Sequence, residues 1–389
     1  MKRLLLVVVL LFSVTGVFSQ KFDFRRVVKP VNAIPDDSTR SIENLVAYFS
    51  THFDTPKDRV MAVYYWIANN ISYDLDMLKA GPQQISNSDR IKHTLSARRD
   101  VCQGYSEVFN SLCQSLGIPS VTISGYTRQK GKVMNLSHGW NAVLLDNKWY
   151  FMDPTWASGF VNNGSFTKKF SSDYFMVPPD KFILTHCPFD PLWQFLDYPF
   201  THSEFINNDF SNARQRAYFN YNDSLAEYNK QTKLQQTEAS ARRIKEYGIE
   251  NQMIADEYNL FIKNAEIYKQ NEKVKVFNEN VDILNQSSAE FNAAVAFFNQ
   301  YNEAKNRQFK TMASDQAIQA VFDSCQARYQ VAKTYFAMIS NPDAEIKKSI
   351  SVFKRQLNDM SNRLEKEQAF LKKYFNTRKP FRKALFYHY

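Results

Sequence analysis

A cysteine, a histidine and an aspartate in the first half of the chain are residue types that can form a nucleophilic site together: Cys102, His138 and Asp153. A thiol is a weak nucleophile until it is deprotonated. A nearby imidazole can take its proton, while a carboxylate holds that imidazole in the useful tautomer. Taken singly, each residue has a structural alternative: a buried thiol, a core histidine and an aspartate that caps a turn. The three in this order predict a cysteine-nucleophile site.

The residues from Cys102 onward are predicted to form a helix, because apolar residues recur at helical spacing: Tyr105, Val108, Phe109, Leu112 and Leu116. Gly117-Ile118-Pro119 then ends the helix. Asp100 and Gln103 match the capping-box pattern, in which an acceptor is followed three residues later by Gln. Cys102 should therefore lie in the first turn, where free N–H groups and the positive end of the helix dipole favour a thiolate.

A hairpin is predicted to bring His138 and Asp153 together. Asp146-Asn147 fits a two-residue turn between strands at 137–145 and 148–153. Pairing outward from this turn gives three cross-strand pairs: Leu145 with Lys148, Val143 with Tyr150, and Trp140 with Asp153. Residues directly opposite share a face, as do residues two apart on one strand. His138 and Asp153 are therefore expected on one face of the sheet, diagonal to each other.

With these segments in place, the sequence resembles the transglutaminase-like branch of the papain-type cysteine enzymes, and within it the kyphoscoliosis-peptidase-like group. The resemblance covers about residues 45–205 and is carried by these blocks: Cys102-Gln103-Gly104-Tyr105-Ser106, Leu116-Gly117-Ile118-Pro119, Ser124-Gly125-Tyr126, His138-Gly139-Trp140-Asn141-Ala142-Val143 and Trp149-Tyr150-Phe151-Met152-Asp153-Pro154-Thr155-Trp156. Flanking segments are also similar to the family: 66–74 upstream, and 174–188 (including 186–188) and 193–196 downstream.

The resemblance implies an α+β fold, in which a transglutaminase-like (papain-type) domain packs a nucleophile-bearing helix on an antiparallel sheet that carries the histidine and the aspartate. It implies acyl transfer through a thioester formed from an amide. The nucleophile, the base and later acid, and the orienting carboxylate would be Cys102, His138 and Asp153. A second oxyanion donor beside the Cys102 N–H is expected. The candidates are Trp66, Tyr73 and Gln103, and the sequence does not choose among them.

Residues 1–19 are typical of a cleaved secretory signal peptide. Lys2 and Arg3 precede an apolar run from Leu4 to Phe12, and Val17-Phe18-Ser19 fits a cleavage site before Gln20. The run is too short to span a membrane, and no later stretch approaches about 20 apolar residues. We therefore expect a secreted or periplasmic protein without a transmembrane segment, with an uncleaved anchor as the alternative.

Charge and cysteine usage argue against several other classes of protein. The net charge of +10 is spread along the chain, so we expect a solvated surface and no nucleic-acid role. The four cysteines are too scattered for a disulfide framework or for metal-ligand spacing: Cys102, Cys113, Cys187 and Cys325. The carboxylates form no recognisable calcium loop, and the chemistry needs no cofactor. Activity that does not depend on a metal is therefore expected.

Composition changes near residue 205, which predicts domains at 20–205 and 206–389. From residue 206 onward, Gly248 is the only glycine, and Pro342 and Pro380 are the only prolines. We therefore predict a long all-α region, a helical bundle or coiled coil, with breaks near Gly248, at 311–314 and at 341–343. The heptads are too irregular for a firm two-stranded coiled coil. This accessory domain is expected to dock a protein partner, to space the enzyme from a surface or to restrict the cleft.

The leading functional prediction is a secreted cysteine-nucleophile acyl-transfer enzyme, a peptidase or amidase acting on a peptide or protein. Two alternatives stay open. One is a non-catalytic binding or scaffold protein that keeps the fold for recognition, although the intact set of three residues counts against it. The other is a protein cross-linking transglutaminase, in which a lysine amine rather than water reaches the thioester.

Overall fold

The computed structural model of this protein describes residues 22–81, 83 and 85–387, and the predicted signal peptide at 1–19 lies outside them. The chain forms two compact units that divide between Ala265 and Glu266. Among the described residues, no helix is long and apolar enough to span a membrane.

The first unit is α+β, as predicted. Its helices are α1 (Arg25–Asn32), α2 (Ile42–His52), α3 (Pro56–Asn70), α4 (Leu75–Ala80), α5 (Asn87–Ala97), α6 (Cys102–Ser115), α7 (Pro154–Ser158), α8 (Pro179–Phe182), α9 (His202–Asn207), α10 (Tyr221–Lys230), α11 (Lys233–Glu246) and the start of α12 (Gln252–Asn306). Its strands are β1 (Ser72–Tyr73), β2 (Arg99–Asp100), β3 (Ser120–Gln129), β4 (Lys132–Leu145), β5 (Lys148–Met152), β6 (Gly159–Asn162), β7 (Ser165–Lys168) and β8 (His186–Pro188). Short 3₁₀ turns occupy Asp36–Thr39, Pro191–Gln194 and Ala213–Gln215.

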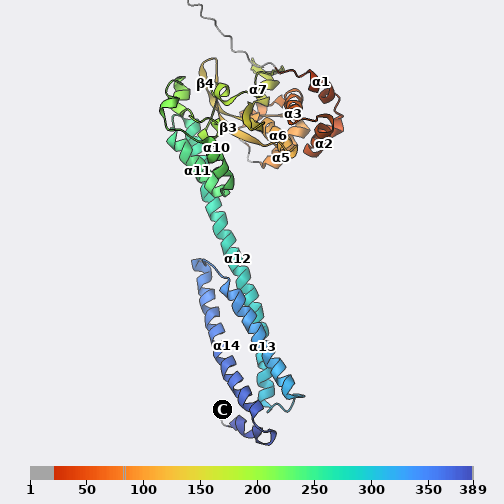
Figure 1. The fold of residues 1–389 in the computed structure, drawn as a ribbon, viewed down its shortest axis with the longest axis vertical. Coiled ribbons are helices and arrows are strands. Elements are labelled where there is room, and N and C mark those ends of the chain that lie inside the picture. Colours follow the sequence, from red (N-terminus) through yellow and green to blue (C-terminus); the bar gives the residue numbers. More distant parts are fainter. Residues whose placement is uncertain (1–21, 82, 84, 388–389) are drawn as a thin grey trace, which may run out of the picture. The chain divides into compact units, whose positions relative to one another are not determined.

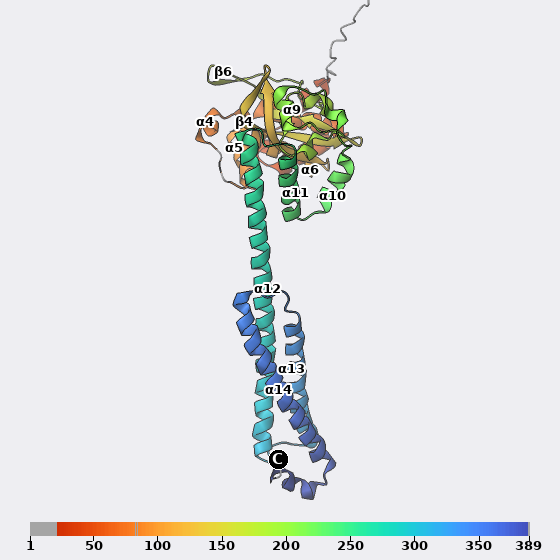
Figure 2. The same ribbon diagram turned by 90° about the vertical axis from the view of Figure 1, so that its left-hand side faces the viewer.

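A four-stranded antiparallel sheet, in the order β5-β4-β3-β8, forms the centre of this unit. Helix α6 lies between the sheet and the N-terminal helices α1, α2 and α3 (Figure 1). Figure 2 shows α10 and α11 side by side, at the end of the unit from which α12 leaves. This is the arrangement that the family resemblance implies, with the cysteine on a helix packed against the sheet.

Both faces of the sheet are buried, and alternation along the strands decides which residue enters which core. Val143 and Leu145 of β4 pack with the α3 and α6 side chains, including Val63 and Phe109. On the opposite face, Trp140 packs in a second core with these residues: Ile123, Ala142, Phe151, Phe182 and Phe195. Because side chains alternate across a strand, the residue two before Trp140, which is His138, faces this second core as well.

The start of α6 differs from the capping box that the sequence predicts. Val101 is the N-cap residue and no side chain caps the helix there. The Asp100 carboxylate is fully buried and instead accepts hydrogen bonds from Arg90 at 2.9 Å and from the Thr94 hydroxyl at 2.7 Å. A buried carboxylate needs charged or hydrogen-bonding partners, and α5 supplies them. Gly104 makes room for it, since a Cβ atom there would lie 2.3 Å from the Asp100 Cγ.

The second unit is all-α, as predicted for the C-terminal region. It contains the remainder of α12, α13 (Asp315–Ala337), α14 (Ala344–Asn376) and a final 3₁₀ segment (Lys379–Tyr387). These helices pack around an aromatic and aliphatic core that includes Tyr301, Phe322 and Phe370. The breaks predicted at 311–314 and 341–343 both fall between helices, and Asp343 caps α14 by accepting from two backbone N–H groups.

Candidate active site

Cys102 is the first residue of α6, as the sequence predicts, and the residue is partly exposed. The thiol lies near the His138 side chain and the backbone of Gly139 on β4, and both interact with it electrostatically. Burial acts to raise the pKa of Cys102, but the interactions with His138 and with the Gly139 backbone outweigh it, so that the pKa is lowered. A thiol with a lowered pKa, beside an imidazole and at a helix N-terminus, is suited to act as a nucleophile.

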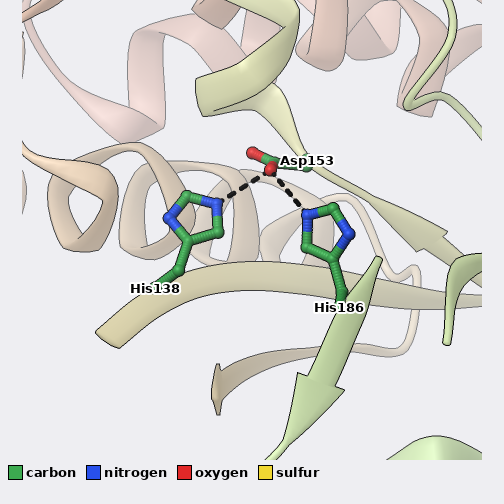
Figure 3. Close-up of side chains that lie close together, drawn as sticks. All are labelled: His138, Asp153 and His186. Atoms are coloured by element: carbon green, nitrogen blue, oxygen red, sulfur yellow. Dashed lines mark hydrogen bonds and ion pairs between the residues drawn. The ribbon is translucent and has the colours of Figure 1, made fainter. Parts of the chain in front are cut away.

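The hairpin has the predicted register and brings His138 to Asp153. Asp146 and Asn147 form the turn with φ of 49° and 59°, values that fit the left-handed residues of a type I′ turn. The observed pairs include Leu145 with Lys148 and Val143 with Tyr150. The Nε2–H of His138 donates to Oδ2 of Asp153 at 2.8 Å (Figure 3).

The electrostatics of this pair favour a protonated imidazole and an ionised carboxylate. Burial acts to lower the pKa of His138, but the charge and hydrogen bond of Asp153 and the interaction with Cys102 raise it to about 10. For Asp153, burial acts in the raising direction, and the charge and hydrogen bond of His138 hold the pKa well below its usual range. Together with the lowered pKa of Cys102, these directions describe a thiolate–imidazolium pair supported by a carboxylate.

The Asp153 carboxylate has partners on both oxygens. Oδ1 accepts the backbone N–H groups of Thr155 at 2.9 Å and Trp156 at 3.0 Å, so Asp153 also caps α7. Oδ2 accepts from His138 and, at 3.2 Å, from Nε2 of His186 (Figure 3). Asp153 therefore caps α7 with one carboxylate oxygen and contacts His138 with the other.

His186 is the site residue that the sequence did not identify. It lies in the flanking segment 186–188 that resembles the family, but neither that resemblance nor a local motif gives this histidine a role in the site. It lies on β8, which pairs with β3 through Thr127 opposite His186. Nothing local to residues 186–188 reports this pairing, because β8 and β3 are separated by about sixty residues. A short strand joining the sheet edge beside Tyr126 would have had to be recognised first.

The remaining cysteines do not resemble Cys102. All four are free thiols, and Cys113, Cys187 and Cys325 are buried. Burial raises the pKa of Cys113, raises that of Cys187 to about 12 and raises that of Cys325 to about 11. Near neutral pH these three stay protonated, so Cys102 is the one cysteine of the described chain with thiolate character.

The three oxyanion candidates lie in different places. Trp66 is only 1% exposed and packs beneath the guanidinium of Arg98. Tyr73 and Gln103 both line the cavity that contains Cys102. Burial raises the pKa of Tyr73, and the nearby charges of Cys102 and Asp153 raise it further. Its hydroxyl therefore stays protonated and able to donate a hydrogen bond beside the thiol.

A large open cavity of about 1440 Å³ leads to the thiol. One wall carries Cys102, His138 and Gly139, and helices α10, α11 and α12 supply side chains to another. One of these is Glu257 of α12, which accepts a hydrogen bond from the Ser124 hydroxyl of β3 at 2.9 Å. Helices that follow residue 205 thus shape the space that a substrate would enter.

His138, Asp153 and His186 (Figure 3) have the ligand types of a metal site, and one ligand atom from each lies within 4.8 Å of the other two. Their separations of 2.8 and 3.2 Å match N–H···O hydrogen bonds to one carboxylate oxygen. A metal would take the Asp153 oxygen and the His138 nitrogen that now bond each other. We therefore interpret the cluster as a hydrogen-bonded one, and chelation tests that interpretation below.

Comparison with known proteins agrees with this geometry. The profile of the transglutaminase-like superfamily matches residues 43–154. Kyphoscoliosis peptidase of Homo sapiens is 31% identical over 175 residues, which cover 43% of this chain and 26% of that protein. "Lim and transglutaminase domain protein ltd-1" of Caenorhabditis elegans is 25% identical over 207 residues, covering 48% of this chain and 27% of that protein. The chain thus spans about a quarter of the length of these curated relatives.

A solved structure described as a putative cysteine protease from Cytophaga hutchinsonii is 20% identical with a TM-score of 0.24, covering 39% of this chain and 48% of that chain. That likeness is too small to support an inference. The sequence match over residues 43–154 includes Cys102, His138 and Asp153 and ends before His186. Together with the helix-on-sheet fold, it establishes that this chain carries a domain of the transglutaminase-like superfamily.

Proposed function

We propose that this protein is a cysteine-nucleophile acyl-transfer enzyme that hydrolyses amide bonds in a peptide or protein substrate. Cys102 is the nucleophile, His138 the base and acid, and Asp153 the orienting carboxylate. The observation that carries the proposal is the arrangement in which the Cys102 thiol interacts with His138, and His138 donates a hydrogen bond to Asp153 at 2.8 Å. The superfamily match and the name of the human relative support the same class of chemistry.

The geometry suggests the following reaction. The Cys102 thiolate attacks the carbonyl carbon of an amide, and the C–N bond breaks as protonated His138 gives a proton to the leaving nitrogen. The acyl group is then a thioester on Cys102. Neutral His138 takes a proton from water, whose oxygen attacks the thioester. The S–C bond breaks, which releases the carboxylic acid and restores the thiolate–imidazolium pair.

The oxyanion of the tetrahedral intermediates needs donors close to Cys102. The backbone N–H of Cys102 belongs to the first turn of α6, whose N–H groups have no acceptor within the helix. We assign the Tyr73 hydroxyl as the second donor, since it lines the same cavity and stays protonated. Loss of one such donor costs about 10²–10³ in kcat, so Tyr73→Phe should show a loss of that order.

The experiment that tests the proposal is turnover of a mixed peptide library by the chain without residues 1–19, with cleavage read by mass spectrometry. Cys102→Ala should abolish all cleavage, whereas Cys113→Ala, which removes a buried thiol of the same helix, should retain it. Full activity in Cys102→Ala would refute the proposal. Incorporation of a labelled primary amine in place of water would identify cross-linking, which the name of the worm relative makes the second candidate.

The proposed location is the periplasm or the exterior of the cell, with residues 1–19 removed as a signal peptide. The apolar run from Leu4 to Phe12 supports this part of the proposal. N-terminal sequencing of the protein from its native source tests it: a mature chain that begins at Gln20 agrees, and one that retains Met1 contradicts it.

A further inference from the structure

His186 is a fully buried histidine with a partner on each ring nitrogen. Its side chain and that of Asp153 both have 0% exposure. Nε2 lies 3.2 Å from Oδ2 of Asp153, and Nδ1 lies 2.8 Å from the Thr185 hydroxyl. Figure 3 shows His138 and His186 approaching the same carboxylate from two strands. The carboxylate oxygen that orients His138 is thus shared with a second imidazole.

The hydrogen bonds determine which nitrogen of His186 carries its proton. Burial lowers the pKa of His186 to about 4, so the ring is neutral and has one N–H. An ionised Asp153 accepts hydrogen bonds and cannot donate one, so that proton must lie on Nε2. Nδ1 is then the acceptor for the Thr185 hydroxyl. That contact, at 2.8 Å, is shorter than the 3.3 Å between the same hydroxyl and the Phe182 carbonyl.

Packing alone does not explain a histidine at this position. The ring stacks on Phe182 with centroids 3.9 Å apart and lies 4.5 Å from the Trp156 ring. An apolar side chain could fill such an aromatic pocket without the cost of burying two polar nitrogens. The imidazole offers something that an apolar side chain cannot, namely an N–H directed at Oδ2 of Asp153.

We propose that His186 is a positioning residue of the reaction proposed above, and that its Nε2–H holds Oδ2 of Asp153 in line with His138. The inference rests on the proposed function, because it acts through Asp153 on the Cys102–His138 pair. With two backbone N–H groups on Oδ1 and two imidazole N–H groups on Oδ2, the carboxylate is held against rotation and kept ionised.

Loss of this N–H has a consequence for the pH range in which the thiolate exists. A less firmly held Asp153 holds the His138 imidazolium less well against the thiol, so the thiolate should form at higher pH. It also stabilises the imidazolium charge less well, so the imidazolium should lose its proton at lower pH. Both limits then move inward. The other titratable groups that interact with Asp153 are tyrosines whose pKa values burial raises, so they stay neutral across this range: Tyr64, Tyr73, Tyr105 and Tyr174.

Three substitutions separate a positioning role from packing. His186→Gln keeps an amide N–H near the position of Nε2. His186→Asn carries the same amide near the position of Nδ1, where it faces Thr185 and is too short to reach Asp153. His186→Leu fills the pocket without a donor. The rate of Cys102 alkylation by iodoacetamide is measured for each from pH 4 to 10, with mass spectrometry of the Cys102 peptide. Thermal unfolding is recorded in parallel.

We expect the acidic limit of Cys102 reactivity to rise by about one pH unit or more in His186→Asn and His186→Leu, a tenfold loss of thiolate below that limit. His186→Gln should stay within about threefold of the unaltered protein at every pH. If His186→Leu does not fold, the comparison of the Gln and Asn variants still tests the positioning role of His186. Equal pH profiles in those two variants, or unchanged limits in all three, would overturn the inference. If Cys102 of the unaltered protein reacts as an ordinary thiol, the proposed function itself fails, and this outcome is separate from the first.

Discussion

Replacement of Asp153 by Asn tests the electrostatic part of the site with little change of shape. The Asn oxygen can take the place of Oδ1 and keep the hydrogen bonds to the N–H groups of Thr155 and Trp156. Its amide NH₂ then occupies the place of Oδ2 and faces Nε2 of His138. A donor there requires His138 to move its proton to Nδ1, the one ring nitrogen that is otherwise left to accept a proton from Cys102. That tautomer cannot accept the proton of Cys102.

The size of the effect follows from the two protonation states. Without the carboxylate charge, burial dominates, and the pKa of His138 should fall from about 10 to below its ordinary value of 6.5. Cys102 then ionises as an ordinary thiol near pH 8.5 and is about 0.3% thiolate at pH 6. A thiolate of higher pKa is intrinsically more nucleophilic, which recovers part of the loss. The net reduction in alkylation rate at pH 6 should be between about tenfold and a hundredfold.

The assay is iodoacetamide labelling of Cys102 at pH 6, accompanied by a proton NMR titration of His138. Asp343→Asn is the matched control, because Asp343 caps α14 through two backbone N–H groups in the same way and lies in the other unit. Asn and Asp are nearly equivalent caps, so the control should leave labelling unchanged. An Asp153→Asn protein that labels within twofold of the unaltered protein, with His138 still titrating near pH 10, would show that Asp153 only caps α7.

Three further predictions concern stability and metals. Gly104→Ala should lower the free energy of unfolding by about 1–3 kcal/mol, because the new methyl group meets the buried Asp100 carboxylate; an unchanged melting temperature would contradict the packing described at the start of α6. Burial lowers the pKa values of His186 and His202 to about 4. The unfolded chain therefore binds more protons between pH 6.5 and 4, and stability should fall as the pH is lowered through that window by up to about 3 kcal/mol per histidine. Urea unfolding at pH 6.5 and pH 4 measures this fall in the free energy of unfolding. The fall should be smaller in His202→Gln, and an equal fall in that variant would refute the lowered pKa of His202. Finally, prolonged chelation should leave Cys102 labelling unchanged, whereas a loss restored by added zinc or calcium would show that the cluster of Figure 3 holds a metal.

The parts of the site that were predictable depend on short-range patterns. The hairpin register follows from a two-residue turn and the alternation of β-strands, so the diagonal approach of His138 to Asp153 was predictable from Asp146-Asn147. The position of Cys102 at the start of α6 followed from helical spacing and from the capping-box pattern at Asp100, although the Asp100 side chain does not cap the helix. Turns and periodicities of this kind involve few residues and depend little on tertiary context.

The parts that were missed depend on contacts distant in sequence or on a competing partner. His186 joins the site through a three-residue strand at the sheet edge, and no local pattern specifies which strand it pairs with. Asp100 fits a capping box by spacing, but Arg90 and Thr94 of α5 bind its carboxylate in the interior. A charge-assisted hydrogen bond in a buried setting is stronger than an exposed cap, so the tertiary partner determines where the side chain lies.

The most direct test of the thiolate–imidazolium pair is the pH dependence of thiol labelling at each cysteine, from pH 4 to 9, in the unaltered protein and in His138→Ala. We expect Cys102 to react in acidic solution, where Cys113, Cys187 and Cys325 do not, and we expect this reactivity to be lost in His138→Ala. Equal reactivity of the four cysteines, or a Cys102 that titrates as an ordinary thiol and is indifferent to His138, would contradict the thiolate–imidazolium pair and favour a non-catalytic role for the fold.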